Sequence, residues 1–136
     1  MQNKYIVDLS EVQLSDLELV GGKNASLGEM IQNLSKLGVN IPGGFALTVE
    51  AYWEFIHFNK LDKRIRSLIK KMKKDDLVSL RRTGLEIRQI IRNGEWPEDL
   101  KEEIKERYHL LSQNYGQDIT DVAVRSSATA EDLPDA

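Results

Sequence analysis

Residues 20–30 read VGGKNASLGEM. The two glycines interrupt regular structure, and from Asn24 apolar residues recur at helical spacing as far as Leu37. Gly38 follows at the position where a left-handed glycine commonly ends a helix. This stretch therefore predicts a helix over residues 24–37, preceded by a flexible glycine pair, and the other elements can be placed around it.

Short strands and further helices are expected on both sides of this helix. Thr48 is placed to cap a helix that begins near Val49, and Pro97 suits the first turn of the last helix. A break between two short helices is expected near Asn59, and Gly116 is expected to end the last helix. Strands are expected at Tyr5–Val7, Phe45–Thr48 and Val122–Arg125, and the remaining helices around residues 51–58, 61–72, 77–91 and 100–111. The predicted fold class is α+β, rich in helix with a few short strands.

Composition limits the classes of function open to these 136 residues. Hydrophobic residues make up 40% and charged residues 30%, as in a soluble globular domain. A formal net charge of -3 opposes general attraction to nucleic acid, and the absence of cysteine excludes disulfides and thiolate metal sites. No stretch reaches the roughly 18 apolar residues of a membrane helix, and residues 1–12 lack the apolar core of a signal peptide. We therefore expect a cytoplasmic protein with neither a nucleic-acid nor a membrane partner.

The glycine pair and the lysine after it form the first candidate site. Glycine lets the backbone approach an anion, the amino end of a helix offers unpaired N–H groups, and Lys23 adds a full positive charge. The stretch is not a P-loop, because the pattern G-x-x-x-x-G-K-[ST] is absent. An ordinary loop before a helix accounts for the same residues, so the pattern alone leaves both interpretations open.

The second candidate site lies in residues 122–136, which read VAVRSSATAEDLPDA. The alternation of Val122 and Val124 with their neighbours predicts a strand that presents Arg125 at its end. The planar fork of arginine suits bidentate contact with phosphate oxygens. Three hydroxyl residues follow, and ordinary turn roles are a stronger interpretation for them than phosphate binding. Three carboxylates come next, and a solvated acidic loop is a stronger interpretation for them than a magnesium site. The hydroxyl residues are Ser126, Ser127 and Thr129, and the carboxylates are Glu131, Asp132 and Asp135.

Three other groups of residues favour structural roles. His57 and His109 have helical apolar and aromatic neighbours, which favours structural or surface positions over catalysis. The basic run Lys60–Lys74 contains an apolar stripe, as in an amphipathic helix with a solvated outer face, rather than an RNA- or lipid-binding face. Four aromatic residues between positions 52 and 58 have helical spacing, and we expect them in the core rather than stacked on an adenine. They are Tyr52, Trp53, Phe55 and Phe58.

Three blocks together resemble the nucleotide-binding domain of the phosphoenolpyruvate-utilising family, and within that family the phosphoenolpyruvate synthases. They are VGGKNASLGEM at residues 20–30, IPGGFALTVEAYWEF at residues 41–55 and VAVRSSATAEDLPDA at residues 122–136. The first and third blocks are very specific, whereas residues 61–117 contribute little. The resemblance covers nearly the whole chain and implies that residues 1–136 are the N-terminal portion of an ATP-binding domain, a partial ATP-grasp fold truncated at its carboxyl end.

The resemblance also implies a reaction and a site. Members of the family convert pyruvate, ATP and water into phosphoenolpyruvate, AMP and phosphate through a phosphorylated histidine on a separate domain. The nucleotide-contacting lysine of the family matches Lys23, and its phosphate-contacting arginine matches Arg125, so both are expected at the ATP phosphates. The Mg²⁺ ligands, the phosphohistidine domain and the pyruvate-binding domain are expected outside this chain. The chain would then be inactive alone and would hold no catalytic residue of its own.

Three alternatives remain open. Pyruvate, phosphate dikinases and rifampicin-type phosphotransferases share the first and third blocks with the synthases. Asn24 after Lys23 and the ending LGEM favour the synthases. An alternative from another class is a non-catalytic helical interaction module, in which Lys23 and Arg125 are merely surface charges.

Overall fold

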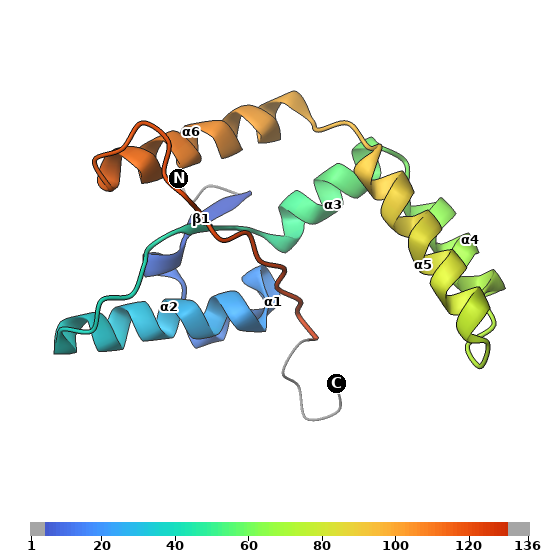
Figure 1. Ribbon diagram of the computed structural model, residues 1–136, viewed down its shortest axis with the longest axis horizontal. Coiled ribbons are helices and arrows are strands. Elements are labelled where there is room, and N and C mark those ends of the chain that lie inside the picture. Colours follow the sequence, from blue (N-terminus) through green and yellow to red (C-terminus); the bar gives the residue numbers. More distant parts are fainter. Residues whose placement is uncertain (1–4, 131–136) are drawn as a thin grey trace. The chain divides into compact units, whose positions relative to one another are not determined.

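The computed structural model describes residues 5–130 and divides the chain into two compact units. Unit 1 comprises residues 1–51 and 98–136, and unit 2 comprises residues 52–97. The described residues form six α-helices and one two-stranded antiparallel sheet, labelled in Figure 1. The prediction of a helix-rich chain with a few short strands is thus confirmed. No helix in residues 5–130 is both long enough and apolar enough to cross a bilayer.

Unit 1 is built around the sheet. Strand β1 (Ile6–Asp8) pairs antiparallel with β2 (Phe45–Leu47), and Val7 lies opposite Ala46. Helix α6 (Glu98–Asn114) belongs to the same unit. The chain between the strands forms 3-10 turns at Leu9–Glu11, Leu14–Asp16 and Ser35–Leu37, and helices α1 (Leu17–Val20) and α2 (Gly22–Leu34).

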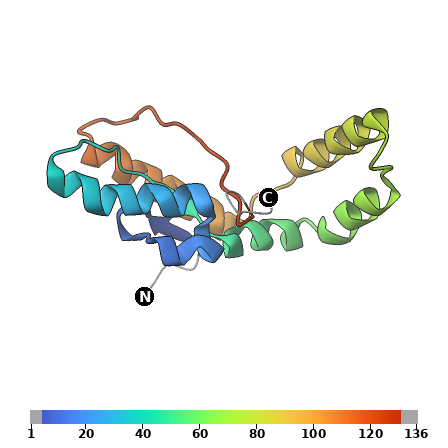
Figure 2. The same ribbon diagram turned by 90° about the horizontal axis from the view of Figure 1, so that it is seen from below.

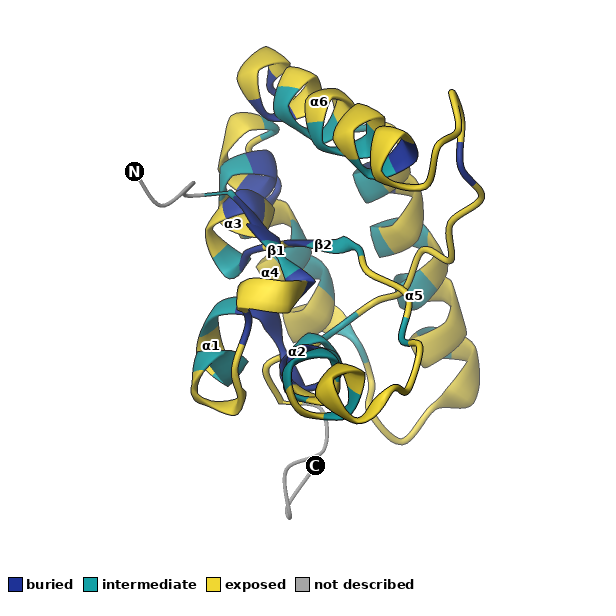
Figure 3. Ribbon diagram, turned by 90° about the vertical axis from the view of Figure 1, so that its left-hand side faces the viewer, coloured by how far each residue is buried: buried dark blue, intermediate teal, exposed yellow. Residues whose placement is uncertain are grey.

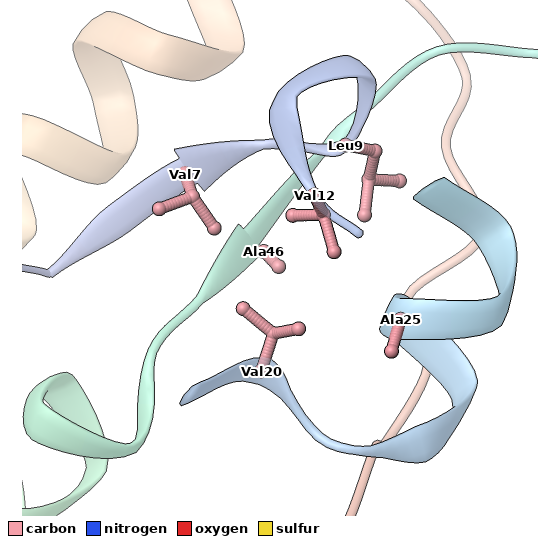
Figure 4. Packing of buried hydrophobic residues seen from close by; sticks show 6 residues of the cluster. All are labelled: Val7, Leu9, Val12, Val20, Ala25 and Ala46. Atoms are coloured by element: carbon pink, nitrogen blue, oxygen red, sulfur yellow. The ribbon is translucent and has the colours of Figure 1, made fainter. Parts of the chain in front are cut away.

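The core of unit 1 lies between the sheet and helix α2. Side chains from both strands, the first 3-10 turn and the two helices point toward one another, as Figure 4 shows for Val7, Leu9, Val12, Val20, Ala25 and Ala46. Gly28 allows α2 to approach this turn closely, because a Cβ there would lie 2.3 Å from the carbonyl oxygen of Val12. The position of α2 therefore depends on the absence of a side chain at residue 28.

The predicted ends of the elements are confirmed at several positions. Gly38 adopts a left-handed conformation with φ 83° directly after the 3-10 turn that extends α2. The buried hydroxyl of Thr48 accepts a hydrogen bond of 3.3 Å from the Ala51 amide and caps α3 (Val49–Phe58). Gly116 is left-handed with φ 66°, just after α6.

Unit 2 consists mainly of α3 and a helical hairpin formed by α4 (Asp62–Lys71) and α5 (Leu77–Arg92) (Figure 2). Its core contains Phe55, Ile56, Leu61 and Ile90. The predicted break near Asn59 is present, and Lys60 there has a left-handed φ of 54°. The basic residues of α4 are exposed, in accordance with the predicted solvated face. Exposed residues also predominate along α5, as Figure 3 shows.

The prediction that the aromatic cluster lies in the core is wrong for three of its four members. Phe55 is buried, but the exposed fractions of Tyr52, Trp53 and Phe58 are 52%, 38% and 52%. The reason is geometric: the apolar side chains of unit 2 pack against the face of α3 that presents Phe55 and Ile56. Helical spacing showed that the residues share a helix, but it did not show how much of that helix has a packing partner.

Candidate functional site

The first candidate motif begins at a glycine that the structure requires. Gly21 has a φ of 82°, in the left-handed region that favours glycine. A Cβ at this position would lie 2.4 Å from the hydroxyl oxygen of Ser127 and 2.9 Å from the amide nitrogen of Ala128. The glycine therefore permits the second candidate motif to lie directly against the amino end of α2, an approach visible in Figure 1.

Two backbone N–H groups at the start of α2 are already used by this approach. The Gly22 amide donates to the carbonyl oxygen of Ala128 over 3.1 Å, and the Asn24 amide donates to the hydroxyl of Ser127 over 3.2 Å. The sequence leaves open whether N–H groups at this helix end bind an anion or belong to an ordinary loop before a helix. In the structure, these two groups hold the second motif instead, because helix-end donors take any acceptor that the fold brings close.

Lys23 joins the same contact. Its Nζ donates a hydrogen bond of 3.0 Å to the carbonyl oxygen of Ser126, which lies 103 residues away in the sequence. We call the three hydrogen bonds between residues 22–24 and 126–128 the clasp. The clasp brings together the two motifs that sequence reasoning selected separately.

Arg125 immediately precedes the clasp in an irregular segment. The residue is exposed, and its side chain forms no ion pair with a described residue. The chain connection to Ser126 places the backbone of Arg125 next to the residue that binds the Lys23 ammonium. Lys23 and Arg125 thus belong to segments that meet in unit 1, although the structure gives no contact between their side chains.

The predicted strand at Val122–Arg125 is not formed. Residues 121–128 have no regular structure, and the exposed fractions of Val122 and Val124 are 50% and 93%. Alternation predicts a strand only if another strand accepts its hydrogen bonds, and within residues 5–130 the sheet contains β1 and β2 alone. The segment is therefore held by the clasp rather than by a ladder of backbone hydrogen bonds.

The hydroxyl residues of the second motif differ from one another. Ser127 is half-buried and bonds a backbone amide, as a turn residue would, but the amide belongs to distant α2. Ser126 and Thr129 are exposed. The acidic residues Glu131, Asp132 and Asp135 lie outside the described residues. Among residues 5–130, no group of three His, Asp or Glu side chains could hold a metal ion.

The two histidines lie on exposed helix faces. His57 stacks on Trp53 with ring centroids 5.4 Å apart. A ring nitrogen of His109 lies 3.0 Å from the Gln113 side-chain nitrogen. Neither takes part in the clasp.

Sequence reasoning missed the connecting roles of Asn24 and Ser127. Besides its backbone bond to Ser127, Asn24 donates from its side-chain amide to the carbonyl oxygen of Val20 over 2.9 Å. This bond ties the end of α1 to the start of α2. Both residues stood inside the quoted motifs, but a contact between segments so far apart leaves no local pattern to detect.

Comparisons with known proteins agree on one family. Residues 17–136 match the family described as pyruvate phosphate dikinase, AMP/ATP-binding domain. The phosphoenolpyruvate synthase of Aquifex aeolicus is 54% identical over 94% of this chain and 15% of its own length. Those of Pseudomonas aeruginosa and Neisseria meningitidis are 48% and 47% identical over 98% and 100% of this chain, and 17% of their own lengths. The chain thus spans about one sixth of the curated relatives that it matches.

Proposed function

The chain belongs to the family of the pyruvate phosphate dikinase AMP/ATP-binding domain, and we propose that it forms the N-terminal part of the ATP-binding domain of a phosphoenolpyruvate synthase. The clasp is the observation that carries this proposal. It joins Lys23 to the segment of Arg125 across 103 residues of sequence. A helical module without a nucleotide site gives no reason for the two motifs that carry these cations to lie together.

Lys23 and Arg125 are the residues that we assign to the ATP phosphates. A triphosphate carries several negative charges, and phosphoryl transfer is accelerated mainly by positioning and by electrostatic stabilisation. The lysine supplies a compact charge with three donors, and the arginine supplies a planar fork that matches two phosphate oxygens. Because their segments meet in unit 1, the two side chains suit contacts with successive oxygens of one polyphosphate.

The proposed reaction belongs to the whole enzyme. Pyruvate, ATP and water would give phosphoenolpyruvate, AMP and phosphate through a phosphohistidine that lies outside residues 1–136. The Mg²⁺ ligands are likewise assigned outside this chain, as the resemblance to the family implies. On this proposal, residues 1–136 are one portion of an ATP-grasp domain in a cytoplasmic enzyme, inactive without the domains that carry the histidine and bind pyruvate.

The test measures phosphohistidine formation after ATP is added to the full-length protein, by mass spectrometry under conditions that preserve the acid-labile bond. A charged hydrogen bond contributes about 1.5–3 kcal/mol, so Lys23→Ala and Arg125→Ala should each slow this step by roughly 10- to 150-fold. Lys36→Ala removes an exposed charge elsewhere in unit 1 and should leave the rate unchanged. Parental rates in both site variants would remove the assignment.

The substrates that the reaction requires, and the products that it releases, distinguish a synthase from its relatives. A synthase releases phosphate and AMP when given pyruvate, ATP and water, whereas a pyruvate, phosphate dikinase requires added phosphate and an antibiotic phosphotransferase requires rifampicin. The three relatives described above are all phosphoenolpyruvate synthases, which favours the first outcome. Failure to bind ATP in a nucleotide titration of the full-length protein would favour the helical interaction module.

A further inference from the structure

We propose that Ser127 is a positioning residue for ATP binding, which acts by holding the segment of Arg125 against helix α2. This inference rests on the proposed function, because it concerns how the arginine reaches the phosphates. Ser127 itself is assigned no contact with ATP. Its hydroxyl accepts the Asn24 amide over 3.2 Å and is half-buried at the amino end of the helix.

Ser127 provides the cap that α2 lacks in its own sequence. The residue before α2 is Gly21, which has no side chain to accept an N–H group of the first turn. The Ser127 hydroxyl accepts one of those groups from a distance of 103 residues. The bond therefore satisfies the helix end and attaches the distant segment at the same time, which an ordinary local cap does not do.

Among the three bonds of the clasp, the one to Ser127 depends on residue identity in the second motif. The Gly22 amide and the Lys23 ammonium bind the main-chain carbonyl oxygens of Ala128 and Ser126, which any residue offers. The Asn24 amide binds a side-chain oxygen. A substitution at residue 127 can therefore remove this bond while the other two acceptors remain.

The segment that carries Arg125 has few other attachments. Its start is fixed at Thr120, whose amide donates to the Ser112 hydroxyl and whose carbonyl oxygen accepts from the Tyr108 hydroxyl. In the described structure, residues 121–125 form no further hydrogen bond. The position of Arg125 is therefore set by Thr120 on one side and by the clasp on the other.

The experiment compares the steady-state kinetics of the full-length enzyme with those of Ser127→Ala. Losing the cap should raise KM for ATP by about 3- to 10-fold and leave KM for pyruvate unchanged. The matched control is Ser26→Ala, which removes an exposed hydroxyl on the same helix and should leave both KM values at the parental level. A merely structural role would change both KM values together or neither of them.

Gly21→Ala gives a second and independent route to the same contact. The new Cβ would displace Ser127 without removing its hydroxyl, so KM for ATP should again rise. The double variant should be no worse than Gly21→Ala alone, because the displaced segment no longer places the Ser127 hydroxyl at the Asn24 amide.

The inference is overturned if Ser127→Ala matches Ser26→Ala in KM for ATP while Lys23→Ala and Arg125→Ala still slow phosphorylation. In that case the proposed function survives. If the last two variants have no effect, or if the parental enzyme is not phosphorylated by ATP, the proposed function fails, and the inference fails with it.

Discussion

Unit 1 gathers segments far apart in the sequence, whereas unit 2 is built from one continuous stretch of chain. The clasp of unit 1 joins residues 103 positions apart, while the core of unit 2 joins neighbouring helices. Unit 2 also carries most of the basic side chains of the chain, and unit 1 carries most of the acidic ones. The candidate phosphate site nevertheless lies in the acidic unit. On the proposed function, the local placement of Lys23 and Arg125 matters more for phosphate binding than the overall charge of the unit.

The largest expected effect comes from truncating one buried isoleucine in each unit. Ile6 in unit 1 and Ile56 in unit 2 both have an exposed fraction of 1%. Each change to alanine should destabilise its own unit by about 2–5 kcal/mol. Hydrogen exchange with mass spectrometry should show faster exchange in the paired strands β1 and β2 for Ile6→Ala and in α4 and α5 for Ile56→Ala. If either variant accelerates exchange throughout the chain, the two units unfold as one, and the difference between them does not extend to their stability.

A smaller effect is expected from replacing one helical glycine in each unit by alanine. The two changes in the free energy of unfolding should have opposite signs. Gly28→Ala places a Cβ 2.3 Å from the Val12 carbonyl oxygen and should destabilise unit 1 by about 1–3 kcal/mol. In unit 2, the nearest atom to a Cβ at Gly84 is the end of the Arg88 side chain, at 3.4 Å. Gly84→Ala should therefore stabilise α5 by about 0.5–1 kcal/mol. Thermal unfolding measures both changes in stability. If both variants were stabilised or both destabilised, the result would contradict the difference in packing around the two glycines.

The smallest effect is expected from exposed ion pairs, which should not distinguish the units. The Lys105 ammonium lies 2.6 Å from Glu102 in unit 1, and Arg66 lies 2.7 Å from Asp62 in unit 2. Removing either cation should shift Tm by no more than about 2 °C, because exposed pairs contribute little. A large shift for one pair alone would show that surface charge contributes unequally to the two units.

The pair of Lys105 and Glu102 should also have a pH-dependent effect, which is easier to detect than its effect on Tm. The hydrogen bond from Lys105, followed by its charge, lowers the pKa of Glu102 below the ordinary value of 4.5. The pair therefore stabilises the fold above pH 4.5, and this contribution is lost as the pH falls through the lower folded-state pKa. In an NMR titration, Lys105→Ala should raise the pKa of Glu102, and an unchanged value would refute the pairing.

Sequence reasoning located the ends of elements well, because those signals are local. Gly38, Thr48 and Gly116 act through their own backbone or through residues a few positions away. The same reasoning failed for the strand at residues 122–125, since a strand exists only with a partner. It also selected Lys23 and Arg125 as members of two motifs, and their roles at ATP stay a prediction.

The contacts that sequence reasoning did not find are the long-range ones. Nothing near Ser127 indicates that its hydroxyl accepts an amide of α2, and nothing near Gly21 indicates which atoms need the space beside it. Such contacts arise only when the fold brings the two segments together. The clasp therefore could be recognised only in three dimensions.

Asn59 fixes both ends of the unit 2 hairpin with one side chain. Its amide nitrogen donates to the Glu95 carbonyl oxygen over 2.8 Å, and its oxygen accepts the Glu95 amide over 2.7 Å. The residues so joined close a loop of chain, and the entropy of loop closure rises only logarithmically with length, by about 0.6 kcal/mol for each doubling. The turn between α4 and α5 is thus a place where evolution can lengthen or shorten the chain at little cost to the two ends that Asn59 holds.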